Sequence, residues 1–120
     1  MTAFHQDLTL CSGDDRTLRF TITDEASAPI NLGGVQSVRW GCARLLANGT
    51  YAWPAAIDKT LQTGIRIADA SGGIIEVALQ SGDTVSLAGR YHHELQMTDA
   101  QGAVSTLASG VIKIIDDLLT

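Results

Sequence analysis

The chain has 120 residues, of which 45% are hydrophobic and 18% charged, and its formal net charge is −5. This size and balance are typical of one globular domain, here residues 1–120, that buries its own core. The eight lysines and arginines are scattered between Arg16 and Lys113, which excludes a cationic patch for nucleic-acid phosphates. No apolar run approaches the ~18 residues of a membrane span, and the first residues lack the pattern of a secretory signal. We therefore expect a protein made in the cytoplasm, with neither a nucleic-acid nor a membrane partner.

Alternation of apolar and polar residues predicts β-strands along most of the chain. Apolar side chains take every second position in six segments, at residues 8–10, 18–22, 38–42, 65–67, 75–79 and 91–97. Two more strands are expected at 104–108 and 111–115, separated by a bulge or bend at Ser109 and Gly110. The segment 51–63 fits either a short helix or an irregular edge strand. One helical turn within 81–87 is predicted, with Ser81 or Asp83 as its N-cap.

Turn chemistry connects these segments. Residues 69–72 and 99–102 share the form D-x-x-G, in which the aspartate caps a tight turn and the glycine adopts a positive φ. Asn48 and Gly49 form a two-residue hairpin signal. Seven or eight short strands with at most one helical turn indicate an all-β fold, an antiparallel two-sheet β-sandwich in preference to a small barrel.

The adjacent His92 and His93 are the first candidate for a site, since the chain has only three histidines. Consecutive strand residues point to opposite faces, so the pair cannot bind one metal ion without distorting the strand. His93 shares the face of Tyr91 and Leu95 and is predicted to be a core histidine with a hydrogen-bond partner. His92 is expected in solvent or at an interface. A metal site completed by His5 and a pH switch are the alternatives.

Other patterns give little support for an enzyme. The adjacent acids, namely Asp14 with Asp15, Asp24 with Glu25, and Asp116 with Asp117, fall in predicted turns or near the terminus and are expected to face water. No G-x-S-x-G nucleophile elbow, phosphate-binding loop or EF-hand is present. We expect no catalytic residue, cofactor or bound metal. Cys11 and Cys42 lack the CxxC spacing and are predicted to be free, buried thiols, with a disulfide as the alternative.

Aromatic and apolar residues supply the candidate interaction surface. Trp40 alternates with Val38 and Cys42 and is predicted to lie in the core. Tyr51 and Trp53 lie in the unassigned segment and are candidates for exposed contacts. Leu118 and Leu119 form an apolar end that a solitary domain has little reason to expose, which suggests self-association.

Leu87, Gly89 and Tyr91 have the spacing of a tyrosine corner, in which the hydroxyl ties a crossing loop to the start of a strand. The motifs around this corner follow a recognisable order: G-D-D-x-T-L-x-F at 13–20, T-D-x-x-x-x-P-I-N-L at 23–32, V-R-W at 38–40, D-x-x-x-G-x-I-x-V-x-L at 69–79, L-x-G-x-Y-x-x-E-L at 87–95, and T-D-x-x-G at 98–102. Over residues 7–115 the chain resembles the immunoglobulin-like β-sandwich domains of tailed bacteriophages and prophages, found in baseplate upper proteins and related tail or fibre-attachment proteins. Ala88 stands where that pattern usually has proline.

The resemblance implies a non-enzymatic structural protein of the virion, assembled in the bacterial cytoplasm. Its partners would be other tail or baseplate proteins, or further copies of itself. The alternative is a carbohydrate-binding or adhesive immunoglobulin-like module, for which Tyr51 and Trp53 would be the contact residues.

Overall fold

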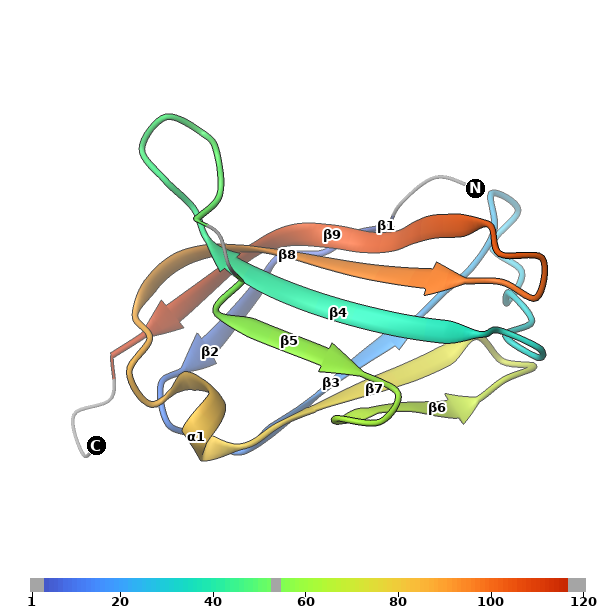
Figure 1. Ribbon diagram of the computed structural model, residues 1–120, viewed down its shortest axis with the longest axis horizontal. Coiled ribbons are helices and arrows are strands. Elements are labelled where there is room, and N and C mark those ends of the chain that lie inside the picture. Colours follow the sequence, from blue (N-terminus) through green and yellow to red (C-terminus); the bar gives the residue numbers. More distant parts are fainter. Residues whose placement is uncertain (1–3, 53–54, 117–120) are drawn as a thin grey trace.

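The computed structural model describes residues 4–52 and 55–116, and these form two β-sheets packed face to face (Figure 1). The larger sheet contains β1 (Phe4–His5), β2 (Leu8–Cys11), β4 (Ser37–Arg44), β5 (Ile57–Thr60), β8 (Gly89–Thr98) and β9 (Val104–Ile115). The smaller sheet contains β3 (Arg16–Thr21), β6 (Ile65–Asp69) and β7 (Ile74–Leu79). One helical turn, α1 (Ser81–Thr84), connects the smaller sheet to the larger. The predicted all-β fold, a two-sheet β-sandwich, is confirmed.

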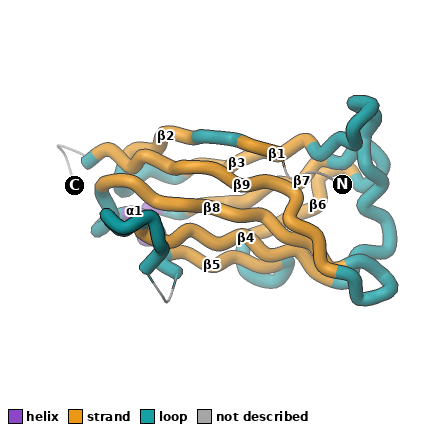
Figure 2. Tube along the Cα trace, turned by 90° about the horizontal axis from the view of Figure 1, so that it is seen from above, coloured by secondary structure: helices purple, strands orange, loops and turns teal. Residues whose placement is uncertain are grey.

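Strand order in the larger sheet is β1-β9-β8-β4-β5, with β2 also paired to β9. In the smaller sheet the order is β3-β7-β6. All pairs are antiparallel except those of β1 and β2 with β9, which are parallel. Figure 2 shows β1 and β2 following one another along the same side of β9.

The core lies between the sheets because alternate residues of each strand point inward. Phe20 and Ile75 come from the smaller sheet, and Trp40, Leu95 and Ile112 from the larger; all are at most 1% exposed. The prediction that Trp40 belongs to the core is therefore confirmed.

The described chain has nine strands rather than seven or eight: β1 was not predicted, β5 confirms the edge-strand alternative for part of 51–63, and the last two predicted strands are one. β1 spans only two residues, too few to show an alternation. β5 is an edge strand, and it resolves part of the unassigned segment 51–63. Its four residues carry a single buried apolar side chain, Ile57, so they show no two-residue period.

β9 corrects a second expectation, because it is one continuous strand through Ser109 and Gly110. The register shift in its pairing with β8 lies where Leu95 pairs with Ala108 and Gln96 with Thr106, which leaves Leu107 as the extra residue. Leu107 is nevertheless buried.

Turn and cap details also differ from expectation. The N-cap of α1 is Gln80, and Asp83 completes a capping box with it. The D-x-x-G turn at 99–102 has its positive φ at Gly102, as predicted, whereas the turn after Asp69 has it at Gly73. Asp69 still accepts a hydrogen bond from the Gly72 amide, at 3.1 Å. Among the described residues, no helix has the length and apolar character needed to cross a membrane.

Candidate functional site

His93 is completely buried and joins two parts of the larger sheet. The indole Nε1–H of Trp40 donates to its Nδ1 at 3.2 Å, and its Nε2 lies 2.6 Å from the carbonyl oxygen of Gln6. Because an indole nitrogen can only donate, Nδ1 must be the acceptor and Nε2 must carry the proton. The predicted core histidine with a hydrogen-bond partner is confirmed.

Burial is the main cause that lowers the pKa of His93, and the neighbouring His92 and His5 act in the same direction. The hydrogen bond to Gln6 and the charge of Asp7 oppose this shift without reversing it. A protonated ring would also turn an Nδ1–H toward the Trp40 N–H, two donors facing each other. His93 therefore acts as a neutral tie between β8 and the Gln6 carbonyl.

His92 lies on the opposite, outer face, as predicted. Its ring stacks on that of Tyr51, with centroids 4.2 Å apart and planes at 9°. Its Nε2 lies 3.0 Å from a carboxylate oxygen of Glu94. Tyr51 is half-exposed, whereas Trp53 lies outside the described residues.

The predicted tyrosine corner has a different form from the expected one. The Tyr91 hydroxyl accepts a hydrogen bond from an Arg44 Nη2 at 3.1 Å, and the same nitrogen donates to the Ala88 carbonyl at 3.3 Å. Arg44 therefore bridges the hydroxyl and the crossing loop, in place of a direct bond. Gly89 has φ +110, a conformation that favours glycine, and Leu87 packs against the core.

A groove with a volume of about 330 Å³ lies on the outer face of the larger sheet, away from the core. Its floor is β4, where Gly41 and Ala43 have outward positions and almost no side chain. Asp58 on β5 and Glu94 on β8 are the register partners of Gly41 on either side. The hollow therefore exists because small residues lie between two rows of longer ones.

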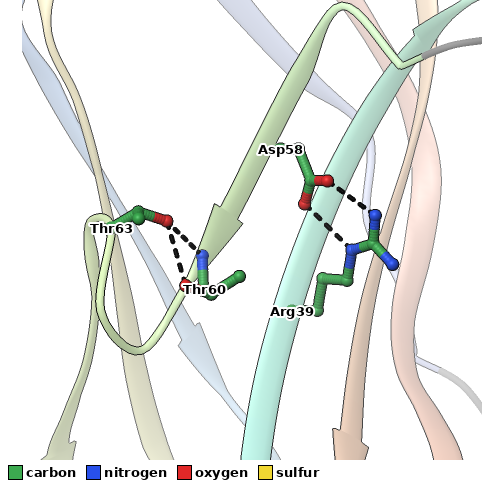
Figure 3. A network of polar contacts seen from close by, with 4 residues as sticks. All are labelled: Arg39, Asp58, Thr60 and Thr63. Carbon is green, nitrogen blue, oxygen red and sulfur yellow. Dashed lines mark hydrogen bonds and ion pairs between the residues drawn. The ribbon is translucent and has the colours of Figure 1, made fainter.

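An ion pair forms one wall of this groove. Arg39 donates from Nε and Nη2 to the two carboxylate oxygens of Asp58, at 2.9 and 2.6 Å (Figure 3). This hydrogen bonding holds the pKa of Asp58 below its usual value and raises that of Arg39. In the same view, Thr63 accepts from the Thr60 amide at 2.8 Å and closes the turn after β5. The wall thus consists of two planar charged groups held in a fixed relative orientation.

Most of the exposed large apolar side chains come from segments at one end of the sandwich. Of the five large hydrophobic residues exposed among the described residues, four belong to this end, namely Leu46, Tyr51, Val85 and Ile115, which we call the α1 end. Figure 1 shows the β4–β5 loop, α1 and the last residues of β9 there. Ser12 connects two of the four, because its amide bonds the Ile115 carbonyl and its hydroxyl bonds that of Val85. Leu118 and Leu119 lie outside the described residues.

The remaining chemical candidates stay separate. In the part of the chain that the structure describes, no three histidine, cysteine or acidic side chains gather where they could hold a metal ion. Five of the six adjacent acids, Asp14, Asp15, Asp24, Glu25 and Asp116, are exposed as expected, and Asp117 lies outside the described residues. Both cysteines are free; Cys42 is buried as predicted, but Cys11 on the edge strand β2 is exposed. Cys11 follows the buried Leu10 and shares the outward face of Thr9, so the two-residue alternation of β2 places its side chain in solvent.

Sequence reasoning missed the groove, although part of its signal was present. Gly41 and Ala43 take alternate, outward positions of β4, where larger polar residues are usual in a half-exposed strand. A glycine inside a strand also often marks a place where another group approaches. The walls, in contrast, depend on the lateral register of β5, β4 and β8, which a single sequence does not specify.

Comparisons with known proteins bear only on the fold. No protein-family model and no curated protein matches this sequence. Among solved structures, the chain is similar to the fibronectin(III)-like modules of Clostridium thermocellum CbhA, with a TM-score of 0.47 and 11% identity, over 97% of this chain and 92% of that chain. No residue role is transferred from this likeness.

Proposed function

We propose that the chain is a non-enzymatic structural protein of a tailed bacteriophage or prophage virion, and that it acts through contacts with another tail protein. The motifs of residues 13–102 support the class of protein. The observation that carries the mode of action is the concentration of exposed apolar side chains at the α1 end. Exposed apolar surface costs free energy in water, and its grouping at one end is typical of a contact surface.

The experiment tests both incorporation into particles and the surface used. Particles are purified from the phage or lysogen that carries this gene, and mass spectrometry measures the copies of this chain per particle. Absence of the chain from complete particles would overturn the proposal.

A matched pair of variants then tests the α1 end. Val85, in the α1 end, is 50% exposed, and Val104, in the hairpin at the other end, is 64% exposed. Both tolerate a charge in the folded monomer because both side chains already meet water. Val85→Asp should reduce incorporation and Val104→Asp should not, with unfolding transitions close to that of the original protein for both. Equal incorporation of the two variants would exclude the α1 end as the contact, and a dimer lost only in Val85→Asp would identify the partner as a second copy.

A second candidate function, carbohydrate binding, has an observation of its own. Tyr51 is half-exposed, stacked on His92, and lies beside a groove with polar walls. Aromatic faces beside planar polar groups are suited to sugar rings, which have apolar faces and polar edges. Tyr51→Ala should then abolish retention on a glycan array, whereas Val85→Asp, whose side chain does not line the groove, should leave that retention unchanged. An array without hits would contradict this candidate.

A further inference from the structure

We propose that the groove over Gly41 and Ala43 is a binding site for one or two rings of a neutral saccharide. The proposal rests on the second candidate function above and adds to it a location, a floor and two walls. The groove residues lie on the outer face of β4, β5 and β8, in positions that the core does not use.

The shape of the groove is built into the backbone. A Cβ at Gly41 would have only the Ile57 carbonyl oxygen nearby, at 4.0 Å. Gly41 is also not among the positive-φ glycines, so neither strain nor crowding explains the absence of a side chain there. The groove has a volume of about 330 Å³. This lies at the lower end of the range of about 300–1,000 Å³ that is usual for small-molecule pockets. A ligand in the groove would contact the strand itself.

The walls present hydrogen-bonding groups from both sides. Asp58 and Glu94 face each other across Gly41. Two residues further along, on the same face, Arg39 and Gln96 are register partners. Carboxylate, guanidinium and amide groups are planar and can each bond two neighbouring hydroxyls. The bidentate bonds between Arg39 and Asp58 fix that wall before a ligand arrives, which lowers the entropy cost of binding.

The other end of the groove is aromatic. Tyr51 reaches it from the loop after β4, and its stacking on His92 fixes the plane of its ring. The bond between His92 and Glu94 connects this stack to the polar wall. A rigid aromatic plate next to polar groups can pack against the apolar face of a sugar ring.

The charge of the lining disfavours an anionic occupant. Arg39 offsets Asp58, which leaves Glu94 as the remaining full charge. A phosphate or sulfate would be repelled by the Glu94 carboxylate. A polyhydroxylated ligand without charge can bond to both kinds of group.

The test uses the whole chain, labelled and applied to an array of immobilised glucose, galactose, mannose, N-acetylglucosamine and their disaccharides, with sulfated saccharides as comparators. The saccharide that is retained is then titrated by NMR into the original protein and three variants. Gly41→Val fills the floor with a side chain that suits a strand. Glu94→Gln changes a wall group, and Ala78→Val is the matched control at an exposed position of β7 in the other sheet.

Gly41→Val should weaken binding about tenfold or more, because the added side chain takes up space that the saccharide would occupy. Ala78→Val should bind as the original protein does, and thermal unfolding should show all variants folded. Binding that Gly41→Val and Glu94→Gln leave unchanged would overturn the site while the carbohydrate function stands. Retention of sulfated saccharides alone would overturn the neutral ligand, and no retention at all would overturn both the site and the second candidate function.

Discussion

At the scale of single residues, the buried imidazole of His93 holds the chain at Gln6, between β1 and β2, against the larger sheet. His93 takes a hydrogen bond from Trp40 and gives one to the carbonyl of Gln6, so each of its nitrogens has a partner. No buried side-chain nitrogen or oxygen among the described residues lacks a partner. A buried polar group is tolerated when it is fully satisfied, and here it also connects distant segments of chain.

The neutral state of His93 predicts a pH dependence of stability. Its pKa in the folded protein is lowered from the ordinary 6.5, so the unfolded chain binds the proton more readily. The stabilisation is therefore complete above pH 6.5 and is lost as the pH falls from there through the folded pKa. Urea unfolding between pH 7.5 and 5, chosen to span about one unit on either side of an ordinary imidazole pKa, should give a free energy of unfolding that decreases toward acid.

His93→Gln tests the origin of this decrease. The variant should be less stable at neutral pH, because it disturbs both hydrogen bonds, but its stability should change less with pH. His5→Gln and His92→Gln are the controls, since each removes another imidazole and leaves the two hydrogen bonds of His93 in place. An unchanged pH slope in His93→Gln would assign the effect to another group. Should that variant not fold, NMR of the original protein decides: an imidazole proton on Nδ1 rather than Nε2 would contradict the assignment.

The corner at Tyr91 gives a second prediction at this scale. Tyr91→Phe should lower the free energy of unfolding by about 1 kcal/mol, because it removes one hydrogen bond of a buried hydroxyl. His92→Ala should cost less, because the His92 ring, 18% exposed, packs on Tyr51 on the outer face and not in the core. A double-mutant cycle of Tyr91→Phe with Arg44→Met, followed by urea unfolding, should show coupling, since Arg44 is the donor to the hydroxyl. Additive effects would mean that Arg44 does not bridge the corner.

At the scale of elements, the N-terminal edge shows how a glycine allows two segments to meet. β1 and β2 each pair with β9, and Gln6 lies between them. The Gln6 carbonyl bonds the His93 ring and not a backbone amide of β9. Asp7 replaces it as acceptor, taking the Val111 amide at 2.9 Å. Gly110 is the register partner of His93, and a Cβ on it would overlap the Gln6 carbonyl.

Gly110→Ala should therefore displace the segment around Gln6 and destabilise the protein by about 1–3 kcal/mol, the usual cost of overpacking. Gly41→Ala is the matched control, since it adds the same methyl group to another strand of the same sheet where space is open. Urea unfolding compares their stabilities, and hydrogen exchange of the amides of residues 5–11 reports on the edge. Equal stability of the two variants would show that this close approach has no energetic role.

The same elements show which features could be predicted from sequence. Strands that alternate over several residues, such as 18–22 and 91–97, were predicted because one face packs on the core. β1 was missed, and β5 was left undecided between a helix and an edge strand, because strands of two or four residues have no measurable period. A bulge or bend was predicted at Ser109 and Gly110, because the contact with Gln6 that requires a glycine at 110 is far away in sequence. The His92 and His93 faces followed from local geometry, whereas the groove needed three strands in register.

At the scale of the whole molecule, the two ends of the sandwich differ. The α1 end carries most of the exposed large hydrophobic side chains among the described residues, while Val104 is the one at the opposite end. Tyr51 belongs both to this end and to the groove on the outer face of the larger sheet. A partner that covered Tyr51 would therefore compete with a saccharide, so assembly and sugar binding through this residue would exclude each other.

The closed sandwich also predicts how its two thiols react. Cys11 is exposed on β2, whereas Cys42 is 1% exposed on β4 between the sheets, where desolvation by burial raises its pKa to about 12. Because the thiolate is the reactive form, a thiol reagent such as DTNB should modify one thiol per folded molecule rapidly and the second only when the sandwich opens. In Cys11→Ser, the folded protein should be unreactive, and its labelling rate should rise with urea in parallel with unfolding. Rapid labelling of Cys42 at neutral pH without urea would mean that the sheets separate locally near β4. If the protein unfolded without reductant had no thiol that reacts with DTNB, the two cysteines would be joined in a disulfide. That result would contradict their separate positions in the fold.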